Sequence, residues 1–275
     1  MLEQVAVQLL NGLVNGMILA LVASGLTLIF GIMDVVNFAH GELYMLGAYV
    51  GTTALAVTGS FWLGVVVQIV ALRPLLGRDP LTTILATFGV SLVLQNYALW
   101  QYGPVARRIP EPVGGHFRLF YLDYPWYRVI VAALAGAILA ALWLFLKHAT
   151  WGVWIRAVTQ DRVMAAAMGI PVPRVHTVVF GLGAAMAGAS GCLSGPLVGV
   201  DQTLGLGIIL RAFIVVVVGG MGNLLGSVLA AVFISLLEAL ASLWVSPAQA
   251  VIVSFVLLIV TLLARPTGLF VPTPK

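Results

Sequence analysis

The sequence predicts an all-α fold, a polytopic transmembrane helical bundle with about eight crossings. Its 275 residues are 61% hydrophobic and 8% charged, whereas a soluble domain carries about 25% charged residues. The mean hydropathy is +1.11, and the apolar runs are long enough to cross a hydrocarbon core of roughly 30 Å. They lack the short alternating pattern of a transmembrane barrel. The solvent for most of this surface is therefore lipid.

Residues 5–32 form the first predicted span. Asn11 and Asn15 are four residues apart and therefore share one face of this helix. Small residues allow close contact between membrane helices, so we expect this helix to pack inside the bundle. The glycines that favour such packing are Gly12, Gly16 and Gly25.

Residues 33–47 are unusually polar for their position. Asp34, Asn37, His40 and Glu42 fall within nine residues, with no soluble loop after them. Polar, irregular backbone at membrane depth is tolerated where it is buried in protein or lines a wet cavity. We predict a broken or re-entrant segment beside a permeation path; the alternative is an interfacial loop with His40 and Glu42 among headgroups. The candidate path residues are Asn15, Asn37, His40 and Glu42.

Seven further spans follow from the apolar runs. Residues 42–72 carry no charge after Glu42 and fit one generous span or two that are too short. Polar connections separate the others, of which 147–174 is the longest and 103–127 is rich in Pro and Gly. The other predicted spans are 81–102, 129–146, 175–197, 206–218, 227–245 and 248–264.

The basic residues predict the orientation, because cytoplasmic loops are enriched in Lys and Arg. Eight basic residues fall on one side, in 73–80, 147–174 and the C-terminal segment, and four fall in 107–128 on the other. We therefore place 73–80, 147–174 and the C-terminus in the cytoplasm.

The stretch from Arg156 to Ile170 is a polar island that favours a short helix. Thr159 is the predicted N-cap, and Asp161 would lie in the first turn, where a negative charge suits the helix dipole. Gly169 stops the helix, with prolines beyond it. The residues leave two interpretations: a helix that docks in the groove of a partner, or an amphipathic helix resting on headgroups.

Two charges inside predicted spans need partners. Arg211 would pair with Glu238 or Asp201, either to lock the bundle or to contact substrate. Glycines at the next turn indicate a close-packed turn or a hinge for a gate. These ion-pair and hinge candidates are Arg211, Glu238, Gly219, Gly220 and Gly222.

The motifs do not indicate catalysis. The sequence has no GxxxxGK[ST] loop to hold ATP phosphates, no zinc-type histidine spacing and no nucleophile motif. Cys192 is the one cysteine, so neither a disulfide within the chain nor a cysteine metal cluster is expected. We expect no bound cofactor, no metal, no nucleic-acid partner and no enzymatic activity.

Four segments together resemble the ABC-type branched-chain amino acid permease family, in its LivH-like branch. They are GLVNGMILALVASGLTLIFGIMDVVNFAHGELYMLGAY, ALRPLLGRDPL with ATFGVSL, RAVTQDRVMAAAMGI and GGMGNLLGSVLAA. The resemblance covers nearly the whole chain and implies one permease domain over 1–275 in a cell inner membrane, with 147–174 as the segment that meets an ATPase. The coupling residues it implies are Arg156, Asp161, Arg162, Ala166, Ala167 and Gly169.

The resemblance also implies the partners. These are a second related permease, two cytoplasmic ATPase subunits that use the ATP, and an external substrate-binding protein. The implied substrates are leucine, isoleucine and valine; alternatives are urea, short amides or other amino acids, and, from another class, a stand-alone channel, an ion-coupled carrier or a scaffold without transport. One departure is that about ten residues separate Phe61-Trp62 from Arg73-Pro74, so a span near 51–72 is shortened or lost.

Overall fold

Helices make up most of the computed structural model, which describes residues 2–50, 60, 62–63, 65–73, 80–119 and 122–270. One antiparallel pair of strands, His116–Leu119 (β1) and Leu122–Pro125 (β2), lies in the loop predicted over 103–127. Five of the described helices are long and apolar enough to cross a membrane, and two more are shorter apolar helices. The all-α membrane bundle is therefore confirmed as a class. In chain order the helices are α1 (Leu2–Met33), α2 (His40–Val50), η1 (Gln68–Leu72), α4 (Pro80–Tyr102), α5 (Trp126–His148), α6 (Thr150–Gln160), α7 (Arg162–Ala167), α8 (Val172–Ser194), η3 (Gly195–Leu197), α9 (Leu204–Gly219), α10 (Leu224–Ala241) and α11 (Pro247–Ala264).

Helix α1 is the centre of the bundle, as the sequence predicts. It packs along α10, α8 and α5, and 83% of its most apolar window is buried, against 22% for α4 and for α5. Its glycines make the close approach possible: a Cβ at Gly16 would lie 2.8 Å from Val232 Cα in α10. A Cβ at Gly25 would lie 2.7 Å from the Gly183 carbonyl oxygen in α8.

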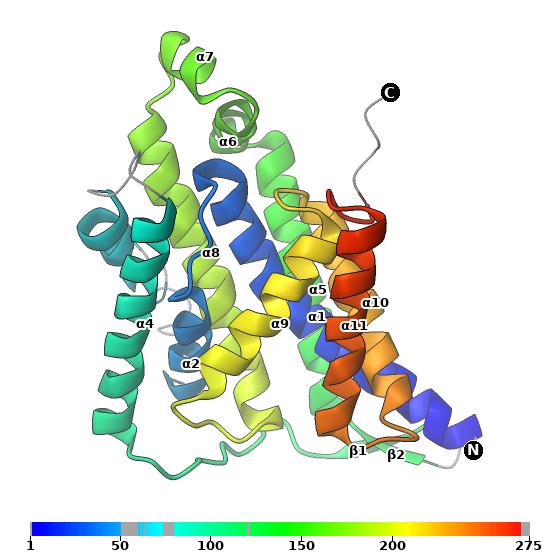
Figure 1. The fold of residues 1–275 in the computed structure, drawn as a ribbon. Coiled ribbons are helices and arrows are strands. Elements are labelled where there is room, and N and C mark those ends of the chain that lie inside the picture. Colours follow the sequence, from blue (N-terminus) through cyan, green and yellow to red (C-terminus); the bar gives the residue numbers. More distant parts are fainter. Residues whose placement is uncertain are drawn as a thin grey trace.

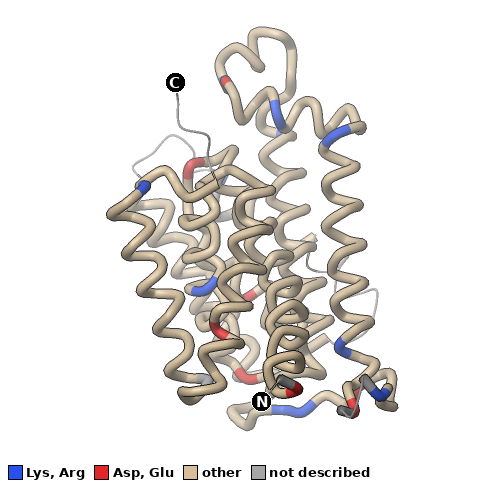
Figure 2. The backbone as a smooth tube through the Cα atoms, turned by 90° about the vertical axis from the view of Figure 1, so that its right-hand side faces the viewer, with Lys and Arg blue, Asp and Glu red and all other residues tan. Residues whose placement is uncertain are grey.

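The bundle has two distinct ends (Figure 1). Helices α6 and α7 project at one end, while the start of α1 and the β1–β2 pair lie at the other. Figure 2 shows charged residues mostly toward these ends, with few along the bundle between them. Segment 147–174 and the end of α11 share one end, as the basic residues predict, and residues 103–119 and β2 lie at the opposite end.

The chain between α1 and α2 is not helical. Asp34 ends α1 in the left-handed region, with φ of +53°, a conformation that Asp tolerates better than most residues. Helix α2 then lies between α8 and α9 at glycine contacts, because a Cβ at Gly47 or Gly41 would collide with the backbone of Gly188 or Gly205. Half of the predicted shortened span near 51–72 lies outside the described residues, which omit 51–59, 61 and 64.

The helix predicted between an N-cap at Thr159 and a stop at Gly169 is wrong at its N-terminal boundary. Residues 150–160 form α6, and a separate six-residue helix, α7, begins at Arg162. The break is at Asp161, whose backbone is extended, with φ of −153° and ψ of 108°. Thr159 is not the N-cap, because its hydroxyl donates back to the Ile155 carbonyl within α6 at 2.9 Å.

Candidate functional site

Three of the predicted path residues gather at the break between α1 and α2. Asn37, His40 and Glu42 are each 1% exposed or less. The Asn37 side-chain oxygen accepts from the Ala39 amide at 3.1 Å, and His40 Nε2 lies 3.1 Å from the Val22 carbonyl oxygen of α1. Ser91 of α4 donates to Glu42 Oε1 at 3.0 Å. The break therefore joins α1, α2 and α4 through polar contacts.

These three side chains also keep unused hydrogen-bonding atoms. Among the described residues, Asn37 Nδ2, His40 Nδ1 and Glu42 Oε2 have no partner. A buried polar atom without a partner is costly, and such atoms are rare in native structures. Glycine at 205 leaves the space for this carboxylate, because a Cβ there would lie 2.5 Å from Glu42 Oε2.

The fourth path candidate lies elsewhere. Asn15 is exposed on α1 and lines a cavity of about 270 Å³ with Asn11, Arg128, Arg211 and Glu238. The structure thus separates Asn15 from the polar break and brings it beside the two charged residues predicted to pair.

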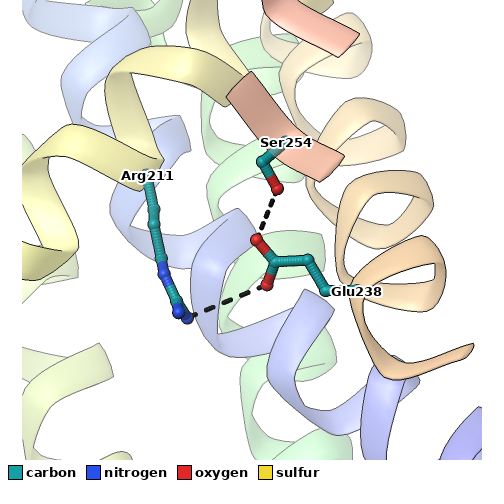
Figure 3. Close-up of polar contacts among 3 residues, drawn as sticks. All are labelled: Arg211, Glu238 and Ser254. Carbon is teal, nitrogen blue, oxygen red and sulfur yellow. Dashed lines mark hydrogen bonds and ion pairs between the residues drawn. The ribbon is translucent and has the colours of Figure 1, made fainter. Parts of the chain in front are cut away.

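Arg211 and Glu238 face each other from α9 and α10 (Figure 3). Arg211 Nη1 lies 3.8 Å from Glu238 Oε2, and the other carboxylate oxygen accepts from the Ser254 hydroxyl of α11. Asp201, the alternative partner of Arg211, instead accepts from the amide and hydroxyl of Thr203, both at 2.7 Å.

A polar network that the sequence interpretation missed borders the same cavity. Arg128 donates to Asn11 Oδ1 at 2.7 Å, and the Tyr124 hydroxyl donates to the same oxygen at 3.2 Å. The spacing of Gln8, Asn11 and Asn15 on one face of α1 was the available signal for this cavity. The partner, Arg128, is 117 residues away from Asn11 along the chain, a separation that no local pattern reveals.

The predicted coupling residues lie at the end of the bundle opposite the start of α1. Asp161 caps α7 by accepting from the Met164 amide at 2.9 Å, and Gly169 ends it with φ of +84°. Ala166 and Ala167 are exposed, and so is Arg156, although it belongs to α6. The apolar side chains of Val163 and Met168 are 81% and 76% exposed. An exposed apolar surface of this kind is typical of a protein contact.

Arg162 connects α7 to the end of α1, next to the polar break. Its Nη2 donates to the carbonyl oxygen of Ile32 at 2.6 Å, in the last turn of α1 and two residues before Asp34. A cation at the C-terminus of a helix satisfies carbonyls that have no partner within the helix. This bond therefore joins α7 to the end of α1.

The glycine turn between α9 and α10 is tightly packed. Gly220 and Gly222 have φ of +99° and +80°, and a Cβ at Gly219 would lie 2.6 Å from the Ser227 amide nitrogen. Asn223 then caps α10 by accepting from the Gly226 amide at 3.1 Å. This geometry accounts for the glycines as turn residues, and movement at a gate stays a prediction.

The long apolar helices and their polar ends define a multi-pass α-helical membrane protein. The profile of the family described as "Branched-chain amino acid transport system / permease component" matches residues 8–262. The chain belongs to this family.

Named relatives span nearly the same length. The chain is 32% identical to the high-affinity branched-chain amino acid transport system permease protein LivH of Escherichia coli, over 95% of this chain and 94% of the relative. It is 30% identical to BraD of Pseudomonas aeruginosa, over 95% and 94%. It is 27% identical to a probable LivH permease of Methanocaldococcus jannaschii, over 92% and 88%. No solved structure matches the chain significantly.

The alignment also bears on chain length. It runs over 289 residues for the Escherichia coli relative, more than the 275 of this chain. The relative therefore carries internal residues that this chain lacks.

Proposed function

We propose that this chain is the membrane-spanning permease subunit of an ATP-binding cassette importer for branched-chain amino acids in the cell inner membrane. The observation that carries the proposal is the family match over residues 8–262, together with relatives named as branched-chain amino acid permeases over more than nine-tenths of the chain. The chain supplies the passage for the substrate and carries out no chemical reaction.

The proposed partners are the other subunits of such an importer. A second related permease encloses the path together with this one. Two ATPase subunits dock on the cytoplasmic side, and an external binding protein delivers the substrate. ATP is used by the ATPase subunits, since this sequence has no phosphate-binding loop. ATP binding closes them and shifts the path between inward-facing and outward-facing populations.

The proposed coupling segment is 147–174, with α7 as the part that docks. Support comes from the exposed surface of Val163 and Met168 and from the bond between Arg162 and the Ile32 carbonyl. A force applied to α7 reaches the end of α1 through this bond. From there it reaches the non-helical residues before α2, which carry Asn37.

The proposed path runs beside this break. We infer about eight crossings, with 33–47 as a broken segment at membrane depth rather than an interfacial loop. The burial of Asn37, His40 and Glu42 with unpartnered atoms supports that inference, because polar groups are kept in such places mainly for function. The path candidates remain Asn15, Asn37, His40 and Glu42.

The test is uptake of labelled leucine, supplied together with the external binding protein, into proteoliposomes that hold both permeases, with and without the ATPases. We expect uptake only with ATPases and ATP, and loss of ATPase co-purification on Gly169→Pro or on charge reversal of Asp161 and Arg162. Uptake by the permeases alone would favour a channel or an ion-coupled carrier. Competition with urea, acetamide and other amino acids defines the substrate class.

A further inference from the structure

The cavity of about 270 Å³ beside α1 contains more charge than a lipid-facing surface can hold. It is bordered by Asn11, Asn15, Arg128, Arg211 and Glu238, which come from four helices. Its volume lies near the lower limit of small-molecule pockets, roughly 300 Å³, which suits a ligand the size of one amino acid. Two guanidinium groups and one carboxylate border the same space.

The position of Arg211 requires a polar neighbour in the assembled protein. Arg211 is near the middle of α9 and its side chain is 42% exposed, against 14% for Glu238. A charged side chain at membrane depth faces a water-filled space, a ligand or another protein group rather than lipid. No other described residue forms an ion pair with the Arg211 guanidinium.

The contact between Arg211 and Glu238 differs from a buried ion pair that stabilises a helix bundle. Their N–O distance of 3.8 Å exceeds a hydrogen bond, and the second carboxylate oxygen of Glu238 is already occupied by Ser254. A lock that stabilises the fold needs close, hydrogen-bonded geometry to offset the desolvation of both charges. Figure 3 shows the guanidinium extended toward Glu238, and both side chains border the cavity.

We propose that this cavity binds a free amino acid as its zwitterion. Arg211 holds the α-carboxylate through two N–H groups, the geometry that guanidinium favours, and Glu238 holds the α-ammonium. Asn15 supplies a further hydrogen bond, while Ala239 and Ala250 border the space left for an apolar side chain. The inference rests on the proposed function and gives it a substrate site.

Arg128 extends the site toward the end of the bundle that carries β1 and β2. It is held at Asn11 by the bond of 2.7 Å, at the first turn of α5. Gln8, Asn11 and Asn15 extend along about 10 Å of α1, from that end toward Arg211. A substrate released at the outer side therefore meets a polar track that leads to the proposed site.

The experiment measures equilibrium binding of labelled leucine to the full permease pair in nanodiscs, without ATPases or binding protein. Three competitors separate the charges: leucinamide lacks the carboxylate, 4-methylpentanoate lacks the ammonium, and N-acetylleucine has its nitrogen neutralised. We expect leucine to compete and each of the three to compete at least ~10-fold more weakly, the effect of losing one charge-assisted hydrogen bond.

Two variants test whether Arg211 and Glu238 form the binding site. Arg211→Gln and Glu238→Gln are each expected to weaken leucine binding at least ~10-fold. The control is Arg118→Gln, which removes an exposed ion pair with Asp123 outside the cavity; it should bind leucine like the unaltered protein. Thermal melts of all three variants, and of Arg211→Gln/Glu238→Gln, show whether folding has changed.

Several results would overturn the proposal. The first is that leucine binding does not saturate up to about 10 mM. The second is that Arg211→Gln binds leucine as tightly as the unaltered protein. The third is that the three analogues compete as strongly as leucine itself. Arg211→Gln could instead dissociate the two permeases while the complexes that remain intact bind leucine normally. That result would show that Arg211 and Glu238 form a contact between the permeases and not a leucine site. If ATP-driven uptake by the unaltered complex persists in any of these cases, the proposed function stands and only the site is wrong.

Discussion

Glycine at position 205 is explained by the carboxylate beside it. The Glu42 side chain occupies the space in which a Cβ at this residue would lie, 2.5 Å from Oε2 and 2.7 Å from Cδ. Because Glu42 is itself held by Ser91, it has little freedom to move aside. The polar break therefore depends on a residue without a side chain in the neighbouring helix.

Gly205→Ala is expected to destabilise the protein by about 1–3 kcal/mol, the usual effect of an added group in a packed site. The matched control is Gly207→Ala in the same helix, where a Cβ would have nothing within 4 Å. That control should be neutral or stabilising, because Ala favours helix over Gly by about 1 kcal/mol. Thermal unfolding in detergent measures both; equal melting temperatures would contradict the packing described here.

At the level of elements, the coupling segment shows what the sequence could and could not predict. A helix stop at Gly169 followed from residue type alone, because the turn needs a positive φ. The N-terminal boundary did not, since Thr159 and Asp161 both have capping side chains and only the fold shows which of them leaves the helix. The exposed and buried sides of α7 likewise could not be predicted from a run of alanines.

The polar break was predicted from density of polar residues, and its contacts were not. Asn37, His40 and Glu42 can be identified from the sequence because they are polar residues close together in an apolar chain. Ser91 of α4, which donates to Glu42, is 49 residues away from it along the chain. Thr87 of α4, which accepts from the Phe38 amide of the same break, is equally far from its partner. Such pairings depend on how helices are arranged, which local spacing does not determine.

Arg162→Gln tests the connection between α7 and α1. We expect the importer to assemble, because the exposed apolar surface of α7 is unchanged, but leucine uptake per ATP hydrolysed to fall roughly fivefold, as loss of about 1 kcal/mol implies. Arg265→Gln, an exposed arginine at the end of α11 and outside 147–174, is the control and should leave this ratio unchanged. A variant with normal coupling would show that the bond to Ile32 carries no force.

At the scale of the whole molecule, the two ends of the bundle must face opposite sides of the membrane. In a Cys192→Ser background, Val113→Cys should react with a membrane-impermeant maleimide in intact cells, because Val113 is exposed and lies just before β1 in the chain. Met168→Cys should react only after the membrane is opened. The reverse pattern would invert the proposed orientation.

We propose that a separate ATPase drives this helix bundle through α7. The most direct measurement is photo-cross-linking from position 168, whose side chain is 76% exposed, in the assembled importer. We predict a cross-link to the ATPase subunit that depends on the helix stop and is lost in Gly169→Pro. A cross-link only to lipid, or to the external binding protein, would contradict the account.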